Sequence, residues 1–245
     1  MKSTVNDMRA VALVPARNEE ALVASTILAL LSLPQITGVI VVDDESHDET
    51  SKRAMDAGAV CARLPFHQGK GAALEHACNL LYELAPFGPL DALDAVLFID
   101  ADLGASATQA DKLLAALAQG HDMAIAGFPA PTKKAGFGMV KRLAHDTILE
   151  LGGFDASWPL SGQRALTLPC LEAIRPFAQN FGVEVALSVR ALWAHMSLIE
   201  VPTTMTHRVS GRSIRGFIHR GRQYLDVAQT ARELMREART ARTLS

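Results

Sequence analysis

Residues 95–104 read AVLFIDADLG, an apolar run that ends in two aspartates one residue apart, Asp100 and Asp102. Such a run of Val, Leu, Phe and Ile predicts a buried strand over residues 95–99. Open α/β sheets bind their ligands at the carboxyl ends of the strands. Two carboxylates at that edge offer hard oxygen ligands for Mg²⁺ or Mn²⁺ and, through the metal, for a diphosphate. The competing interpretation is a pair of solvated acids at a strand end, and a D-x-D motif alone does not exclude it.

The chain around this strand alternates between strand and helix patterns. Strands are expected at 10–14, 38–42, 59–64, 95–99 and 122–127, with helices at 19–33, 46–57, 71–84 and 107–118. This alternation predicts an α/β fold with a mostly parallel central sheet covered by helices. The second half is less regular: a loop at 128–138, helices at 139–151 and 183–194, a short helix near Pro169 and a strand at 197–206. Residues 214–240 read as a long amphipathic helix or helix pair.

Each expected strand of the first half is followed by polar or glycine-rich residues. These segments are Pro15-Ala16-Arg17-Asn18-Glu19-Glu20, Asp43-Asp44-Glu45-Ser46, His67-Gln68-Gly69-Lys70-Gly71 and Asp100-Ala101-Asp102. A carboxylate such as Glu19 or Asp43 can accept a hydrogen bond from a ribose hydroxyl or a base N–H, and Lys70 at a helix N-terminus can meet a phosphate. Each segment alone could be a helix cap or a turn. Four of them at one sheet edge favour a ligand site.

Four strings, VALVPARNEE, VIVVDDESHDET, QGKGAALEHA and VLFIDADLG, together resemble the nucleotide-binding half of family 2 glycosyltransferases, which have the GT-A fold. The resemblance implies a UDP- or GDP-linked sugar donor. It also implies that residues 15–19 and Asp43 hold the nucleoside, that Lys70 lies near it, and that Asp100, Ala101 and Asp102 hold the metal and the diphosphate. Asp102 would thereby be catalytic.

The second half resembles, more loosely, polyprenyl- and dolichyl-phosphate sugar transferases and glucosyl-3-phosphoglycerate synthases. SGQRAL at 161–166, FGVEVAL at 181–187 and EVPTTMTHRVSGRS at 200–213 carry this resemblance. It places His207 where some GT-A enzymes supply a third metal ligand, and a neutral imidazole suits Mn²⁺. The alternative for His207 is a solvated histidine at a strand end.

Many inverting members of the family carry an acidic pair that serves as general base, but residues 158–164 read WPLSGQR, without a carboxylate. An alcohol acceptor needs a base to take its proton, whereas a phosphate is already an anion. The sequence therefore predicts an anionic acceptor, either a polyprenyl phosphate or a small phosphorylated metabolite. Arg164, Arg208 and Arg212 would bind it, Arg164 and Arg208 as catalytic residues. Solvated or packing arginines, with Asp155 or Glu184 as the base, are the alternative.

The charge of the chain is unevenly distributed. Of 245 residues, the segment from Arg208 onward holds nine Arg and three acids, whereas residues 1–207 hold 15 basic and 23 acidic residues. A basic tail suggests peripheral contact with an anionic membrane or a helix folded back on the body. Three scattered cysteines and a polar N-terminus without a signal peptide indicate a cytoplasmic protein, and the basic tail would place it at the inner face of the membrane if it binds lipid. No nucleic-acid partner is expected, and a homodimer is left open.

We therefore expect a nucleotide-sugar-binding half at 1–127, an acceptor-binding half of the same domain at 128–213, and a helical C-terminal extension at 214–245. The predicted function is metal-dependent sugar transfer. A sugar nucleotidylyltransferase would explain VPAR but needs a glycine-rich loop in place of residues 18–20, and a non-catalytic nucleotide-sugar-binding protein is also consistent with these motifs.

Overall fold

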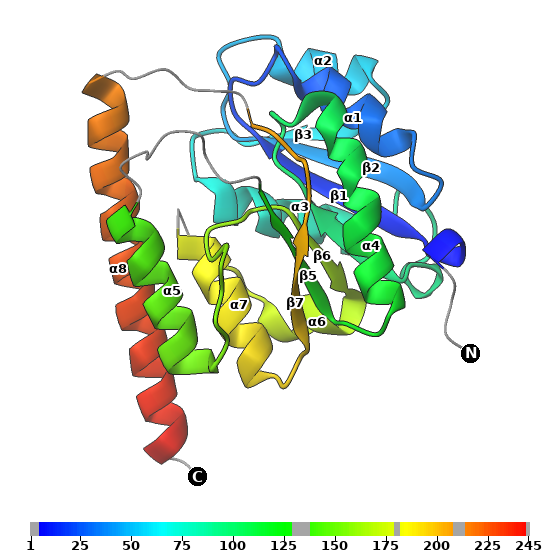
Figure 1. Ribbon diagram of the computed structural model, residues 1–245. Helices are drawn as coiled ribbons and strands as arrows, with labels where there is room; N and C mark the ends of the chain where they lie inside the picture. Colours follow the sequence, from blue (N-terminus) through cyan, green and yellow to red (C-terminus); the bar gives the residue numbers. More distant parts are fainter. Residues whose placement is uncertain (1–4, 129–137, 179–181, 208–213, 244–245) are drawn as a thin grey trace.

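A seven-stranded sheet forms the centre of the computed structural model, which describes residues 5–128, 138–178, 182–207 and 214–243 (Figure 1). The strand order is β3-β2-β1-β4-β6-β5-β7. The strands are β1 Ala10–Ala16, β2 Ile36–Asp43, β3 Val60–Arg63, β4 Ala95–Phe98, β5 Met123–Gly127, β6 Arg164–Thr167 and β7 Leu198–Pro202. Strand β6 runs antiparallel to its neighbours β4 and β5, and the other pairs are parallel. The expected mostly parallel sheet is confirmed, but β6 itself was not expected.

Helices cover both faces of the sheet because its inner strands are apolar on both sides. Along β1, Ala10, Ala12 and Val14 face one hydrophobic cluster, and Val11 and Leu13 face the other. The first cluster includes side chains of α1 Val23–Leu31, α2 Thr50–Asp56 and α4 Ala110–Ala118. The second includes α3 Lys70–Leu84, α6 Leu168–Ile174 and α7 Val183–Trp193. Three short 3₁₀ helices, η1 Val5–Asp7, η2 Leu90–Ala92 and η3 Gly104–Gln109, complete these layers.

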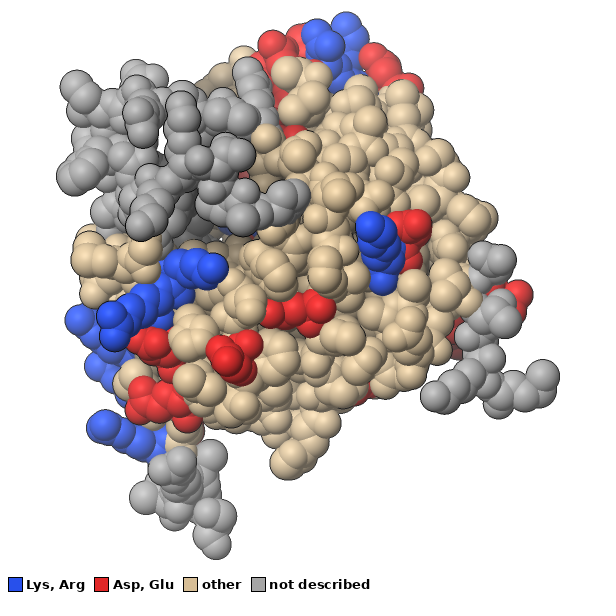
Figure 2. All heavy atoms as spheres, viewed as in Figure 1, with Lys and Arg blue, Asp and Glu red and all other residues tan. Residues whose placement is uncertain are grey.

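A further helical layer lies outside α7. It consists of α5 Gly138–Gly152 and the long C-terminal helix α8 Ile214–Thr243, which lie side by side (Figure 1). Val227 and Leu234 of α8 pack with Ala144 of α5 in a third buried cluster. Part of the basic tail therefore does fold back on the body. Figure 2 shows basic and acidic side chains interspersed along the edge where α8 and α5 lie, while most of that face is uncharged.

No helix among the described residues is both long enough and apolar enough to cross a bilayer.

Two helices begin later than the sequence pattern suggests. Helix α1 was expected from residue 19 and α2 from residue 46, but the residues before each helix form two loops that bind each other. The backbone N–H of Asn18 donates to Ser46 Oγ at 2.9 Å, and that of Glu19 donates to Thr50 Oγ1 at 2.8 Å. Asn18 and Glu45 adopt positive φ angles of 56° and 61°, which end regular structure at both places. These loops lie at the carboxyl edge of the sheet.

Candidate functional site

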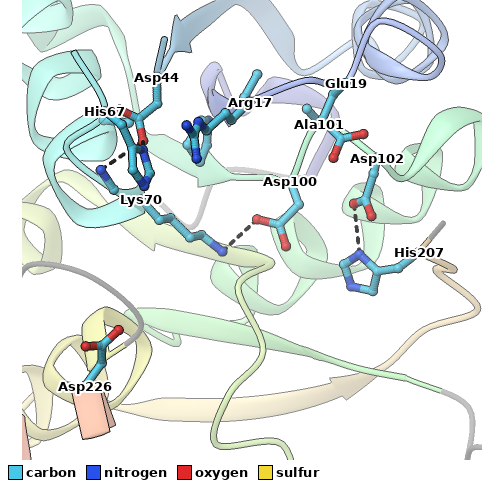
Figure 3. A pocket seen from close by; sticks show the side chains of 14 residues that line it. Arg17, Glu19, Asp44, His67, Lys70, Asp100, Ala101, Asp102, His207 and Asp226 are labelled. Carbon is cyan, nitrogen blue, oxygen red and sulfur yellow. Dashed lines mark hydrogen bonds and ion pairs between the residues drawn. The ribbon is translucent and has the colours of Figure 1, made fainter. Parts of the chain in front are cut away.

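A pocket of about 700 Å³ opens at the carboxyl ends of β1, β2 and β4 (Figure 3). Because these strands are parallel, the polar segments that follow them meet at this edge. The pocket is lined by Pro15, Ala16, Arg17, Glu19, Asp44, His67, Gly69, Lys70, Ala73, Asp100, Ala101, Asp102, His207 and Asp226. It therefore contains most of the residues that the sequence nominated.

Asp100, Asp102 and His207 form one cluster, although His207 is 105 residues from Asp102 in the chain. One potential ligand atom from each residue lies within 4.8 Å of the others, and His207 Nδ1 is 2.9 Å from Asp102 Oδ1. Two carboxylates and an imidazole suit Mn²⁺, and the carboxylates alone suit Mg²⁺. The turn that carries Asp102 is anchored by Thr26 of α1, whose hydroxyl donates to the Ala101 carbonyl and accepts from the Gly104 N–H, both at 2.8 Å. The residues present thus fit a divalent cation.

Gln163 supports this cluster from the loop before β6. Its Nε2 donates to Asp100 Oδ2 at 2.8 Å and lies 3.2 Å from His207 Nε2, and its Oε1 accepts from the Asp100 N–H at 3.2 Å. Burial works to lower the pKa of His207, but the hydrogen bond with Asp102 and the charge of Asp100 raise it above its usual value. Sequence reasoning missed Gln163; its place in the SGQR segment was the available signal.

Lys70 lies between two carboxylates. Its Nζ is 2.6 Å from Asp100 Oδ1 and 3.0 Å from Glu184 Oε1 on α7. Burial alone would lower the pKa of Lys70, but these two anions raise it, so the ammonium keeps its charge. Burial would raise the pKa of Asp100, yet Lys70 and His207 lower it. Gly162 packs directly against this ion pair, since a Cβ there would lie 3.2 Å from Asp100 Oδ2.

The other end of the pocket is organised by Asp44 (Figure 3). Its carboxylate accepts from the N–H groups of Gln68 at 2.7 Å and Gly69 at 2.8 Å, and His67 Nδ1 lies 2.7 Å from Asp44 Oδ2. These contacts hold the loop between β3 and α3 against the end of β2, so that His67 and Lys70 face the same pocket. Asp44 and His67 both lie in the polar segments quoted from the sequence, but neither was singled out there as a binding residue.

The structure corrects the predicted roles of Asp43 and Asn18. Asp43 is fully buried, accepts from the Ser46 N–H at 2.7 Å and the Ser51 hydroxyl, and does not line the pocket. Asn18 Oδ1 accepts from the His47 N–H at 2.8 Å, in the interlocked loops. Both side chains stabilise the loops that shape the pocket, and Asp44 lines the pocket in the place expected for Asp43.

The acceptor-binding role predicted for Arg164 is also corrected. Arg164 is 0% exposed, and its guanidinium donates to Ser161 O at 3.0 Å, Ser188 Oγ at 2.9 Å and Glu184 O at 2.9 Å. Burial lowers the pKa of Arg164 to about 10, which leaves it charged at neutral pH. A side chain enclosed in this way is a structural element beneath the site. The other two arginines nominated for the acceptor, Arg208 and Arg212, lie outside the described residues.

Three further carboxylates differ in where they lie relative to the pocket. Asp226 of α8 lines the pocket, and no hydrogen bond or ion pair joins it to any of the described residues. Nothing in the sequence around Asp226 indicated this position. Asp155, one alternative base, is 85% exposed, accepts from His145 Nε2 at 2.8 Å and lies outside the pocket. Glu184, the other alternative, contacts Lys70 at the rear of the site.

A mostly parallel sheet with a paired-aspartate cluster at the carboxyl end of β4 defines the GT-A class of nucleotide-diphospho-sugar transferases. Residues 11–164 match the family model described as "Glycosyl transferase family 2". This match spans more than half of the chain, which therefore belongs to glycosyl transferase family 2.

Comparisons with individual proteins agree with this assignment. The chain is 30% identical over 206 residues to "Glycosyltransferase AglJ" of Haloferax volcanii, covering 81% of this chain and 63% of that protein. It thus spans less than two thirds of that relative. Glucosyl-3-phosphoglycerate synthase from Mycobacterium tuberculosis, in complex with phosphoglyceric acid, has a TM-score of 0.71 and 26% identity, with 93% of this chain and 80% of that one covered. The same enzyme with Mn²⁺, UDP-glucose and phosphoglyceric acid gives 0.68 and 26%, with 91% and 80% covered.

Proposed function

We propose that this protein transfers a sugar from a nucleotide-sugar donor to an acceptor in a reaction that depends on Mg²⁺ or Mn²⁺. The observation that carries the proposal is the cluster of Asp100, Asp102 and His207 in a pocket that also receives Lys70. Bound to this cluster, the cation would neutralise charge on the diphosphate leaving group. The 26% identical synthase, whose structures contain Mn²⁺ with UDP or UDP-glucose, supports the same chemistry.

The chain's own residues would supply positioning and charge. Asp100 and Asp102 are held in place by Gln163 and by the Thr26 anchor, so little reorganisation is needed when a ligand binds. Lys70 brings a positive charge to the same place, where it can contact a diphosphate oxygen. Glu184, 3.0 Å from Lys70 Nζ, would keep the ammonium in place while Asp100 holds the cation. Arg17 and Glu19 line the pocket, where the nucleoside would lie.

The acceptor we propose carries a phosphate, as either a polyprenyl phosphate or a small phosphorylated metabolite. The support is the synthase bound to phosphoglyceric acid and the absence of a carboxylate in residues 158–164. With Arg164 enclosed, Arg208 and Arg212 are the remaining candidates to bind this phosphate. Competition between phosphorylated and unphosphorylated acceptors would test it: transfer to neutral hydroxyls alone would refute the phosphate requirement.

Removing one metal ligand tests the central proposal. Asp102→Asn should weaken Mn²⁺ binding by about 10- to 100-fold and abolish donor turnover with the fold retained, because an amide oxygen of equal size replaces a carboxylate. Asp111→Asn, on the exposed side of α4, is the matched control. Metal titration by calorimetry and release of UDP or GDP from the sugar donor are the readouts. Full turnover in Asp102→Asn, or in excess chelator, would refute the metal role.

The same assays separate the competing functions. A nucleotidylyltransferase would release pyrophosphate from a nucleoside triphosphate and a sugar phosphate, whereas a glycosyltransferase releases the nucleoside diphosphate. A non-catalytic protein would bind a donor without any release. Turnover of a nucleotide sugar to the diphosphate would exclude both alternatives.

Three expectations remain proposals. Peripheral contact with an anionic membrane is consistent with the exposure of Met139 on α5 and Leu225 on α8, at 76% and 67%. Sedimentation with anionic vesicles at low and high salt would test it, and no binding at low salt would refute it. We also propose that the protein forms a homodimer. The domain is further proposed to divide at residue 128 into a donor-binding half and an acceptor-binding half.

A further inference from the structure

His67 lies at the end of the pocket formed by β1 and β2, away from the Asp100–Asp102 pair (Figure 3). Its side chain is 49% exposed, so the core does not require it. The metal cluster does not involve it either. Its ring is nevertheless fixed, because Nδ1 lies 2.7 Å from Asp44 Oδ2. A half-exposed ring held in one orientation inside a ligand pocket is suited to recognition.

Asp44 determines which ring nitrogen faces the pocket. The Asp44 side chain is 7% exposed and already accepts two backbone N–H bonds, from Gln68 and Gly69. An ionised carboxylate can only accept hydrogen bonds, so Nδ1 of His67 must carry the hydrogen. In the neutral ring, Nε2 then bears a lone pair. No hydrogen bond to this Nε2 comes from any residue that the structure describes, so it is available to accept one from a ligand.

A donor lies beside this acceptor. Glu45 Oε2 connects His67 with Arg17. It accepts a hydrogen bond from the backbone N–H of His67 at 3.1 Å and lies 3.9 Å from Arg17 Nη2. The Arg17 side chain, 39% exposed, also lines the pocket. Since a guanidinium only donates, this end of the pocket pairs one hydrogen-bond donor with one acceptor.

The separation from the metal cluster matches a nucleotide. Strand β1 lies between β2 and β4, so the two strand ends are about 10 Å apart at the usual spacing between neighbouring strands. A nucleoside diphosphate whose phosphates lie at Asp100 and Asp102, and which extends along this edge, brings its base to Arg17 and His67.

We propose that His67 determines donor specificity by accepting a hydrogen bond from a ring N–H of the nucleobase, with Asp44 as the residue that positions it. This inference rests on the proposed function. Uracil and guanine present a ring N–H beside a carbonyl oxygen, which complements His67 Nε2 and Arg17. Cytosine presents a lone pair and an amino group at the corresponding positions, so the pairing is reversed. The site should therefore prefer uridine or guanosine donors to cytidine donors.

The test compares binding of UDP, GDP and CDP in the presence of Mn²⁺, by calorimetry at about pH 8. In the wild-type protein, UDP or GDP should bind about tenfold more tightly than CDP. His67→Phe keeps a flat ring without an acceptor and should reduce this ratio to about threefold or less. Asp44→Asn should reduce it as well. His121→Phe, at the opposite edge of the sheet before β5, is the matched control and should keep the wild-type ratio.

Each outcome decides something. An unchanged ratio in His67→Phe, with Mn²⁺-dependent binding retained, would overturn this inference and leave the proposed function intact. CDP binding as tightly as UDP and GDP to the wild-type protein would do the same. No Mn²⁺-dependent binding of any of the three would overturn the proposed function, and this inference with it.

Discussion

Replacing Arg164 by methionine should destabilise the fold strongly, because the guanidinium is fully buried and makes three hydrogen bonds of 2.9–3.0 Å. Each hydrogen bond from a charged donor contributes about 1.5–3 kcal/mol. The cost of burying the charge, several kcal/mol, offsets much of this sum. Methionine fills part of the space but leaves Ser161 O and Ser188 Oγ without this donor. We expect a net loss of about 2–4 kcal/mol in the free energy of unfolding.

Urea unfolding, followed by circular dichroism, measures this loss. For a chain of this size it corresponds to a fall of roughly 5–15 °C in melting temperature. Arg142→Met is the matched control: its side chain is 84% exposed and lies 3.5 Å from Asp146, so the change should cost about 0.5 kcal/mol or less. Wild-type stability in Arg164→Met, combined with a raised KM for the acceptor, would refute the structural role and restore the acceptor-binding role.

Two further predictions concern Asp226, which lines the pocket, and His145, which lies outside it. Asp226→Asn should lower the KM for a phosphorylated acceptor several-fold, because it removes from the pocket a carboxylate that repels an anion. The Kd of Mn²⁺–UDP should stay unchanged, since Asp226 contacts none of the described metal-site residues; an equal change in UDP affinity would contradict this. Hydrogen bonds to Asp146 and then Asp155 raise the pKa of His145, so their stabilisation is complete below the unfolded-state pKa and disappears as the pH rises through the folded-state pKa. An NMR titration of His145 should show a lower pKa in Asp155→Asn, and an identical pKa would contradict the assignment.

The first half of the fold could be predicted because its pattern is regular. Apolar runs with β-branched residues and intervening helical periodicity indicate parallel strands, and the carboxyl ends of such strands meet at one edge. This rule predicts that Asp100, Asp102 and Lys70 lie close together, and the structure places them together. His207 lies in the second half, and its position followed from the family resemblance.

The second half was less predictable for physical reasons. Strand β6 contains only four residues, and Pro169 just after it favours a helix start, so its pattern is dominated by the following helix. The direction in which a side chain points could not be predicted from the sequence either. Adjacent Asp43 and Asp44 differ because one carboxylate binds Ser46 and Ser51, whereas the other faces the pocket and binds the His67 loop. The position of Asp226 in the pocket depends on how α8 packs against the rest of the protein, and no local sequence pattern encodes that packing.

The reversed direction of β6 has a consequence for sequence variation around the site. Because β6 pairs antiparallel with β4, with Arg164 opposite Phe98, the chain enters this strand at the edge where β4 ends. Gln163 meets Asp100 there, whereas Thr167 at the other end of β6 is opposite Ala95. Insertions or deletions in residues 153–163 would therefore change the spacing of the ligand cluster directly. Changes just after Thr167 would act at the far edge of the sheet and on the partly buried helix α6, away from the pocket.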